Sequence, residues 1–535
     1  SIHKSISRAM RPLACITLFA IFNYAICARI LGLFPHPGRS HHMVFESLLQ
    51  KLPERGHHVT VASFFPLKSP PANYTDVSFE GITKIGLETI DLNCYENPEF
   101  ILRIPIIGRI YKQIIDFNPL WESALSVCSK AIDWPPLKEA LSKEYDVVLV
   151  ENFNSDCMIG LLHVYQIKAP VVAMLSSNLL PWSHERIGAP DNPSYVPLIT
   201  TTFTSRMTFL ERMENTFLKL YLNLFYQQKI QMKERAMIEK HYGVKIPELN
   251  ELAKNISLML TNTHHAFNGV RPLVPGLVEV GGMHFNPTKK VIPEFIEKFL
   301  NESEHGVIIF SFGSLIKTAT MPKYKEEIFI NALSKLKQRV IWKFEHSAEE
   351  GTLVGNILKV KWLPQYELLH HKKVVAFIAH GGLLGMTEAV SAGKPMVVIP
   401  FYGDQPNNGA SAESVGFAKV ISYMDLTEES LSEALQFVLS YPVGFDSLAS
   451  VENLQHKRLE SAPLDTAIYW VERVIRWGHA GKLHSVSRDM PFYEYLLLDV
   501  LAVYALIVLA IIMIIYFLLI RIFYLFIKET KQKVH

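Results

Sequence analysis

The sequence has few cysteines and no excess of either charge. Its 535 residues include five Cys, and 53 Lys and Arg stand against 51 Asp and Glu. Such a balance gives no reason to expect a nucleic-acid partner. Cys15 and Cys27 lie in an apolar N-terminal stretch, which leaves Cys94, Cys128 and Cys157, an odd number without metal or redox spacing. We therefore expect no disulfide framework, and a fold stabilised by burial of a large core.

Motifs for metal binding are missing as well. The sequence contains no D-x-D triplet and no His/Cys cluster at the spacing of metal ligands. It also shows no short-period repeat and no low-complexity tract. We therefore expect an ordinary globular chain of more than one domain that requires neither a metal nor a cofactor.

Long apolar runs occur near both ends. Residues 13–28 follow Arg11 and end at a small residue, which predicts a signal peptide region at 1–28, with an uncleaved anchor as the alternative. Residues 500–520 carry no charge and reach the ~20 residues that a membrane span needs. Because the tail at 521–535 is rich in Lys and Arg, which mark the cytoplasmic side, a transmembrane helix at 496–520 places the residues between the signal region and this helix, here called the body, in a lumen.

Signals for location agree with this topology. Lys531 and Lys533 match the K-x-K-x-x pattern that retrieves type I proteins to the endoplasmic reticulum, although a plain stop-transfer tail is the alternative. N-x-S/T sequons at Asn73, Asn255 and Asn301 fit a lumenal glycoprotein. We expect a single-pass protein of the endoplasmic reticulum membrane.

Strands and helices alternate in both halves of the body. A strand at 29–35, a helix at about 41–52 and a strand at 57–65 form a βαβ unit, and further strands are expected at 145–150 and 170–175. The pattern predicts two doubly wound α/β domains with a cleft between them, at 29–285 and 306–453, joined by a linker at 286–305. A helical region at about 201–242 has three interpretations: the wall of a ligand pocket, a membrane-surface contact, or ordinary amphipathic packing.

Residues 377–409, FIAHGGLLGMTEAVSAGKPMVVIPFYGDQPNNG, carry the strongest signal. A buried strand at 374–379 leads through His380, Gly381 and Gly382 into a helix at 383–392, and a second strand ends at a polar loop. A glycine turn before a helix directs backbone N–H groups and the positive helix end at one point, which favours a phosphate. Asp404 and Gln405 offer an acceptor and an amide suited to sugar hydroxyls.

This ordered set resembles the signature of the UDP-glycosyltransferases. GVIIFSFGS at 306–314 and WLPQ at 362–365 are similar to further segments of that family, and the front end ILGLFPHPGRSHHMVF is similar to its insect members. The resemblance implies the GT-B type of fold: two facing Rossmann-like domains, the second holding a UDP-sugar donor and the first an acceptor. It also implies that helices at 454–495 return to the first domain.

The resemblance assigns donor-binding residues in the second domain. Trp362 is expected to stack on uracil, Gln365 to bind the base or ribose, and Glu388 to accept from the ribose hydroxyls. The phosphates and the sugar are expected to meet the remaining set, Ser314, His380, Gly381, Gly382, Gly385, Asp404 and Gln405. Leu384 stands where many relatives carry Asn, so one polar contact is absent or replaced.

His41 is the expected general base. It follows the first strand and lies just inside a helix that Ser40 can cap, where the positive helix end keeps its ring neutral. His42 is turned by about 100° around the helix and serves as a control. The carboxylate that orients His41 is either Glu151, which replaces the Asp of many relatives and which we favour, or Asp156.

The predicted function is hexose transfer from a UDP-sugar to a hydroxyl group of a small lipophilic acceptor, with inversion, in the service of detoxification. Glucose is favoured over glucuronate because no basic cluster accompanies Asp404 and Gln405. Two alternatives stay open: a glycolipid-forming transferase, and a catalytically impaired relative that binds hydrophobic ligands. The predicted transferase is also compatible with a homo-oligomer.

Overall fold

The computed structural model describes residues 27–85, 89–96, 99–285, 291–440, 462–478 and 483–532. Its contacts divide the chain into two compact units, Ser1–His484 and Ser485–His535. Several sequence predictions fall outside the described residues: most of the signal region, residues 286–290 of the linker, residues 454–461, and the last three residues of the tail.

The first sheet is built from seven parallel strands in the order β3-β2-β1-β5-β6-β7-β8. Moving outward from the β1–β5 pair, the strands follow one another in sequence order on both sides, so the topological switch point lies between β1 and β5. The strands are short apolar runs, and β5 and β6 are buried along their whole length, as expected for parallel strands covered on both faces. Their bounds are β1 Arg29–Phe34, β2 His58–Ser63, β3 Tyr74–Ser78, β5 Val147–Glu151, β6 Val171–Leu175, β7 Ile256–Thr261 and β8 Leu277–Glu279.

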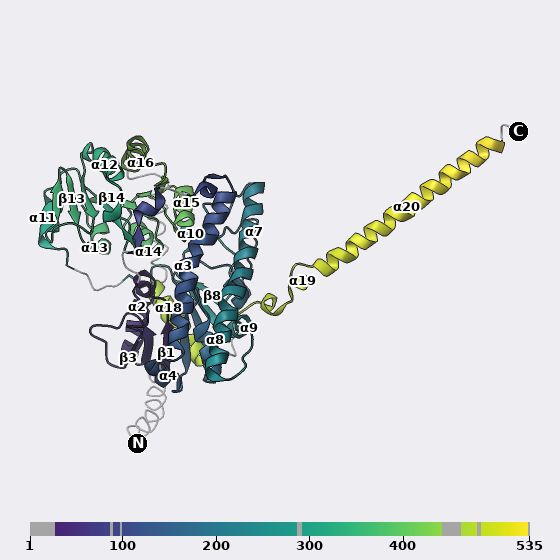
Figure 1. The fold of residues 1–535 in the computed structure, drawn as a ribbon, viewed down its shortest axis with the longest axis horizontal. Coiled ribbons are helices and arrows are strands. Elements are labelled where there is room, and N and C mark those ends of the chain that lie inside the picture. Colours follow the sequence, from purple (N-terminus) through teal and green to yellow (C-terminus); the bar gives the residue numbers. More distant parts are fainter. Residues whose placement is uncertain are drawn as a thin grey trace, which may run out of the picture. The chain divides into compact units, whose positions relative to one another are not determined.

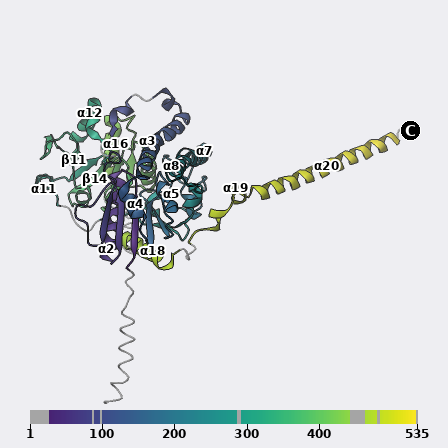
Figure 2. The ribbon, with the colours of Figure 1, turned by 60° about the horizontal axis from the view of Figure 1, so that its bottom comes forward.

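Helices cover this sheet, and two separate apolar clusters pack on its two faces. Figure 2 shows α2 beside the strands of the sheet. The helices are α2 Arg39–Glu54, α3 Ile107–Ala131, α4 Pro135–Leu141, α5 Cys157–Val164, α6 His184–Ile187, α7 Phe209–Tyr226, α8 Met232–Tyr242, α9 Leu249–Ala253 and α10 His265–Asn268, with a 3₁₀ turn η2 at Phe100–Arg103 and a π-helical turn η3 at Gln227–Gln231.

The second sheet has the order β12-β13-β11-β9-β14-β15-β16. Only the β12–β13 pair is antiparallel, and the switch point lies between β9 and β14. The strands are β9 Val307–Ser311, β11 Arg339–Lys343, β12 Thr352–Val354, β13 Ile357–Val360, β14 Val374–Ala379, β15 Met396–Val398 and β16 Ala418–Val420. The helices around it are α11 Glu294–Asn301, α12 Lys323–Ser334, α13 Gln365–Leu369, α14 Leu383–Ser391, α15 Gln405–Val415 and α16 Glu428–Ser440 (Figure 1).

Each half of the body contributes a segment to the other half. Strand β4 (Ile90–Asp91) pairs with β10 (Ile316–Lys317), and Leu92, at the start of the 3₁₀ turn η1 (Leu92–Tyr95), is buried in a core cluster of the second sheet. In the opposite direction, α18 (Pro463–Trp477) packs on α2, where Arg55 pairs with Glu472. Figure 2 places α18 beside the first sheet. The two sheets thus belong to one compact unit.

Three details differ from the sequence predictions. Helix α2 begins at Arg39 with Gly38 at its N-cap, so Ser40 lies within the helix and does not cap it. Residues 201–208 are not helical, and α7 begins after Thr208, which forms a capping box with Glu211. Cys128 and Cys157 form a disulfide, which corrects the expectation of none.

The second unit consists of a 3₁₀ turn η6 (Val486–Asp489), α19 (Phe492–Tyr495) and the long helix α20 (Leu498–Gln532). Residues Leu498–Ile527 form a candidate membrane span, within which an 18-residue window has a mean hydropathy of 3.1. The span therefore begins two residues after the predicted start at residue 496 and continues beyond the predicted end at residue 520.

Candidate active site

The histidine expected to act as base lies at the switch point of the first sheet. His41 is in the first turn of α2, which follows β1, and Glu151 is the last residue of the neighbouring strand β5. Side chains at the carboxyl ends of adjacent parallel strands converge, particularly where strand order reverses. The fold thus brings together two residues that are 110 positions apart.

The His41 ring is held on one side by two oxygen atoms. Its Nδ1 lies 3.2 Å from Glu151 Oε1 and 2.7 Å from Ser176 Oγ. The other carboxylate oxygen of Glu151 accepts from the backbone N–H of His36 at 3.3 Å. The motif analysis did not identify Ser176, which directly follows β6, the next strand along; its position after a buried strand was the available signal.

Burial shifts both groups toward their neutral forms. It lowers the pKa of His41 to about 4 and raises the pKa of Glu151 to about 7, although the nearby His36 acts in the opposite direction. The Glu151 side chain is 3% exposed, whereas the His41 side chain is 21% exposed. A substrate can therefore reach the histidine but not the carboxylate behind it.

Two aromatic rings pack against the ring of His41. Ring centroids lie 4.3 Å away for His36 and 4.4 Å away for Phe153. His42 turns the other way, into the core, where its ring meets Phe34 and Phe65. The adjacent histidine is thus placed as the helical period predicts.

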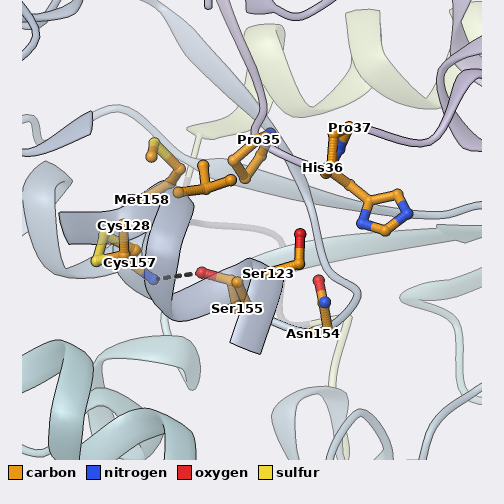
Figure 3. Close-up of a pocket in the computed structure, with 11 residues that line it drawn as sticks. Pro35, His36, Pro37, Ser123, Cys128, Asn154, Ser155, Cys157 and Met158 are labelled. Carbon is orange, nitrogen blue, oxygen red and sulfur yellow. Dashed lines mark hydrogen bonds between the residues drawn. A yellow bond between two sulfur atoms is a disulfide. The ribbon is translucent and has the colours of Figure 1, made fainter. Parts of the chain in front are cut away.

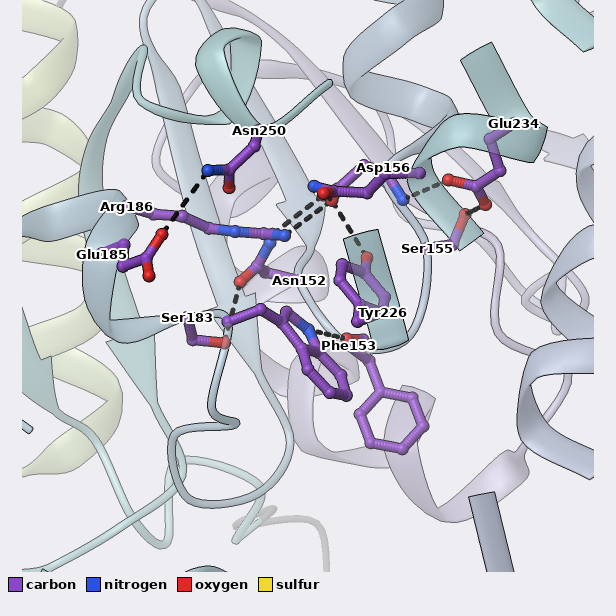
Figure 4. A network of polar contacts seen from close by, with 12 residues as sticks. Asn152, Phe153, Ser155, Asp156, Ser183, Glu185, Arg186, Tyr226, Glu234 and Asn250 are labelled. Carbon is purple, nitrogen blue, oxygen red and sulfur yellow. Dashed lines mark hydrogen bonds and ion pairs between the residues drawn. The ribbon is translucent and has the colours of Figure 1, made fainter. Parts of the chain in front are cut away.

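Asp156 lies in a different, buried cluster (Figure 4). Its carboxylate accepts two hydrogen bonds from Arg186, at 2.8 and 2.6 Å, and one each from Tyr226 and Gln231. Its backbone N–H donates to Glu234, which also accepts from Ser155. The hydrogen bonds of the Asp156 carboxylate thus go to Arg186, Tyr226 and Gln231, whereas the carboxylate beside His41 is that of Glu151.

A small hollow lies between the loop after β1, the end of α3 and the start of α5 (Figure 3). Its volume of about 270 Å³ includes the open solvent at its mouth, so the enclosed part is far smaller than a typical ligand pocket. The lining combines apolar groups and the Cys128–Cys157 disulfide with a few polar side chains, namely His36, Ser123, Asn154 and Ser155.

In the second sheet, the expected phosphate turn also lies at the switch point. His380 follows β14, and its ring packs against the turn after β9, where a Cβ on Gly313 would lie 2.6 Å from His380 Cε1. Gly381 has a φ of +88°, which favours glycine, and Gly382 is the N-cap of α14. Ser314 follows in the β9 turn and is partly exposed. Burial lowers the pKa of His380 to about 4, with a smaller effect of Lys343.

The residues expected to bind the nucleoside lie along α13 and α14. Gln365 Nε2 donates to Glu388 Oε2 at 2.7 Å, and a Cβ on Gly385 would lie 3.0 Å from the same nitrogen. The Trp362 side chain is 64% exposed, with Lys343 Nζ 5.8 Å from its ring centre. The exposed indole offers a stacking surface, and the partly buried Gln365–Glu388 pair offers a polar edge.

The loop after β15 carries the residues expected to bind the sugar. Burial raises the pKa of Asp404 to about 6, and its Oδ2 accepts from Asn408 at 2.9 Å. Gln405 is buried, and its Oε1 accepts from the backbone N–H groups of Phe401 and Tyr402. The Gln405 carbonyl thus shapes the loop, which leaves its amide group as the part that can donate to a ligand.

Loops from the two sheets contact each other near these residues. Asn407 Nδ2, in α15, donates to Phe203 O at 3.0 Å, and α10 packs on α15. Leu384 packs against an apolar cluster of the first sheet. Over the described ranges, no three His, Cys, Asp or Glu side chains gather as they would around a metal ion.

The family model that matches this chain is described as UDP-glucoronosyl and UDP-glucosyl transferase, and it spans residues 33–534. UDP-glycosyltransferase UGT5 of Dactylopius coccus is 36% identical over 504 residues, covering 91% of this chain and 90% of the relative. UDP-glucuronosyltransferase 2B1 of Rattus norvegicus is 30% identical over 512 residues, with 93% of each chain covered.

Solved structures share the fold at low sequence identity. A glycotransferase of kitacinnamycin has a TM-score of 0.55 at 17% identity and covers 84% of this chain and 98% of its own. The glycosyltransferase SnogD of Streptomyces nogalater has a TM-score of 0.52 at 18% identity and covers 84% and 99%. The likeness establishes the GT-B arrangement of two α/β domains.

Proposed function

Because the chain belongs to the UDP-glucoronosyl and UDP-glucosyl transferase family, we propose that it transfers glucose from a UDP-sugar to a hydroxyl group of a small lipophilic acceptor, with inversion. Its class, a UDP-glycosyltransferase, follows from family membership. The observation that carries the proposed mechanism is the His41–Glu151 contact of 3.2 Å at the switch point of the first sheet.

His41 acts as the general base in this mechanism. Its Nδ1 faces Glu151 and Ser176, so the tautomer with Nδ1 protonated leaves Nε2 with a lone pair for the acceptor hydroxyl. As the hydroxyl oxygen attacks the anomeric carbon from the face opposite UDP, Nε2 takes its proton. The ionised Glu151 carboxylate then stabilises the imidazolium that forms.

The donor lies on the second sheet in this proposal. Trp362 stacks on uracil, Gln365 and Glu388 bind the base or ribose, and the pyrophosphate meets the backbone N–H groups at the start of α14. His380 and Ser314 complete the phosphate contacts, and Asp404 and the Gln405 amide bind the sugar. As the new glycosidic bond forms, the bond from the anomeric carbon to the β-phosphate oxygen breaks and UDP leaves without a required metal, so excess EDTA should not change turnover.

Substitution of the base tests the proposal. His41→Ala should lower kcat by about 10²–10⁴-fold while UDP binds unchanged in titration calorimetry, because the nucleotide contacts residues of the other sheet. His58→Ala, which removes an exposed histidine from β2, is the matched control and should retain full activity. Turnover of the His41→Ala protein near the level of the control would refute the role of His41.

The body is proposed to face the lumen of the endoplasmic reticulum. The candidate span Leu498–Ile527 supports a single-pass anchor, and the K-x-K-x-x tail and the three sequons favour this compartment and type I topology. A lumenal, membrane-anchored transferase of this kind would conjugate lipophilic hydroxyl compounds for detoxification. Turnover of UDP-[sugar] with a panel of phenols, steroids and membrane lipids distinguishes this activity from glycolipid synthesis.

A further inference from the structure

Helix α7 has an unusual distribution of side chains. Its six exposed residues are all Phe, Leu or Met, with 49–66% of each accessible: Phe209, Leu210, Met213, Phe217, Leu220 and Leu224. Five of them recur at intervals of three and four residues, so they form one stripe along the helix. Single exposed apolar residues are common on protein surfaces, but a continuous stripe of this length marks an interaction surface.

The buried face of α7 combines three core residues, Leu218, Leu222 and Tyr226, with charged and polar groups. Glu214 is buried and pairs with Arg109 of α3 at 2.6 Å, and Lys219 is buried and pairs with Asp191. Asn215 is fully buried and makes three hydrogen bonds with backbone groups of residues 193, 196 and 198. Helix α7 thus buries a mixed apolar and polar face, in which the polar groups are paired, and exposes residues that are all apolar, whereas the exposed face of a water-facing helix is polar.

Helix α16 shows the ordinary arrangement on the same body. It buries Leu431, Ala434, Leu435 and Val438 and exposes mainly polar residues, including Glu429, Glu433 and Gln436. The wholly apolar exposed face of α7 is therefore a local property and not a feature of the whole surface.

We propose that the exposed stripe of α7 lies in the interfacial region of the membrane that holds the Leu498–Ile527 span. Basic residues flank the stripe: Arg206 and Arg212 at one end, and Lys229 and Lys233 at the other. Arg212 and Lys229 also extend over the Phe209 and Phe225 rings. Apolar side chains with basic residues around them suit a bilayer surface, where the cations meet lipid phosphates.

The point at which the chain leaves the body supports a lipid occupant. Leu483 accepts a hydrogen bond from Gly276 N at 2.7 Å, and Gly276 lies against Ile187 of α6. The neighbouring Glu185 of α6 accepts from Asn223 of α7 at 2.9 Å. Residues 484–497, which lead to the span, can extend over at most ~50 Å, so a bilayer that holds the span lies within reach of the body.

Photolabelling from the lipid phase tests this proposal. The full-length chain is reconstituted in phosphatidylcholine vesicles that contain a phosphatidylcholine with a diazirine in its acyl chain, and labelled peptides are mapped by mass spectrometry. Peptides of α7 should be labelled together with the 498–527 peptide, while the α16 peptide should stay unlabelled. If the span is labelled and α7 is not, the proposal is wrong and the membrane anchor is supported. If the span is not labelled, both are wrong. Equal labelling of α7 and α16 would show nonspecific partitioning and would also contradict the proposal.

A polar variant gives a second measurement. The variant combines Met213→Ser, Phe217→Ser and Leu220→Ser in a full-length chain with a protease site inserted between His484 and Ser485. Its transfer of sugar to a water-soluble phenol should be unchanged. After insertion in vesicles and cleavage, the body of this variant should be released, with a membrane-bound fraction at least ~10-fold below that of the cleaved parent. Equal retention of the two bodies would contradict the proposal, as would an α7-dependent dimer in detergent, which would assign the stripe to a second copy.

Discussion

Glu151 is the group whose ionisation should control activity near neutral pH. Its folded-state pKa is about 7, while that of His41 is about 4, so His41 is already neutral throughout the range in which Glu151 titrates. Below about pH 7 the protonated carboxyl can no longer stabilise an imidazolium. We predict that kcat/KM falls below this pH, approaching about tenfold per pH unit.

The Glu151→Gln variant provides the control for this pH profile. It keeps a polar group beside His41 Nδ1 but cannot ionise, so its lower activity should lack the inflection near pH 7. Glu151→Asp should retain the inflection. An unchanged acidic limb in Glu151→Gln would assign the titration to another group, such as Asp404, whose pKa of about 6 is also raised by burial.

At the donor side, Glu388 should affect UDP-sugar binding alone. Its carboxylate already accepts from Gln365 at 2.7 Å, and Ala at position 388 removes both this contact and those to the ribose. Each lost buried hydrogen bond costs about 1 kcal/mol or more, so the donor KM of Glu388→Ala should rise at least several-fold. The KM of the acceptor should stay the same, and an unchanged donor KM would exclude Glu388 from the site.

At the scale of elements, Asp156 joins α5, α6, α7 and η3 through its contacts with Arg186, Tyr226 and Gln231. Asp156→Asn leaves the Arg186 guanidinium buried without its counter-charge, a change that typically costs about 3–5 kcal/mol. We predict a low yield of folded protein, measured as the fraction that binds UDP, with near-normal turnover per folded molecule. Glu151→Gln should show the opposite pattern, full yield and slow turnover.

Glu234 in the same cluster should make stability depend on pH. Burial, with a smaller contribution from Asp156, raises its folded-state pKa to about 8 from an ordinary value of 4.5. A raised carboxyl pKa gives stability that is full below about pH 4.5 and is lost as pH rises toward about 8. The thermal midpoint of the parent in detergent should therefore fall between pH 6 and pH 8.5 by more than that of Glu234→Gln. Parallel profiles would contradict this assignment.

Local patterns predicted the elements, but not the contacts between distant residues. The apolar run at 374–379 gave the bounds of β14 correctly, and the helical period separated His41 from His42. The partner of His41 stayed open because Glu151 and Asp156 lie five residues apart, and the choice depends on Arg186 and Gln231, 30 and 75 residues further along. The disulfide was missed for the same reason: it depends on the end of α3 packing beside the start of α5.

For helix α7, composition alone could not decide which face is covered. Its mixture of aromatic, Met, Lys and Arg residues was compatible with a pocket wall, a membrane contact or ordinary packing. The buried pairs of Glu214 with Arg109 and of Lys219 with Asp191 show which side faces the core. Both partners come from segments remote in sequence, so the helical pattern itself contained no signal for them.

At the scale of the whole molecule, the tail should determine location. Replacement of Lys531 and Lys533 by Ser removes the K-x-K-x-x pattern and should let the protein leave the endoplasmic reticulum, so that its glycans become resistant to a high-mannose-specific glycosidase. The parent should stay sensitive. Continued sensitivity of the double variant would show that the span or the lumenal body retains the protein.

The exchange of segments between the two halves limits how such chains can recombine. Consider a chimera of two relatives that is joined near residue 305. Leu92 would come from one parent but would fill a core of the second half, which comes from the other parent. Helix α18 would likewise pack on a first half that comes from the other parent. Halves that have diverged at these places would lose part of a core at each junction. Functional hybrids should therefore arise when residues 90–95 are taken from the parent of the second half and residues 463–477 from the parent of the first half. The segments that must be exchanged together are thus discontinuous in sequence.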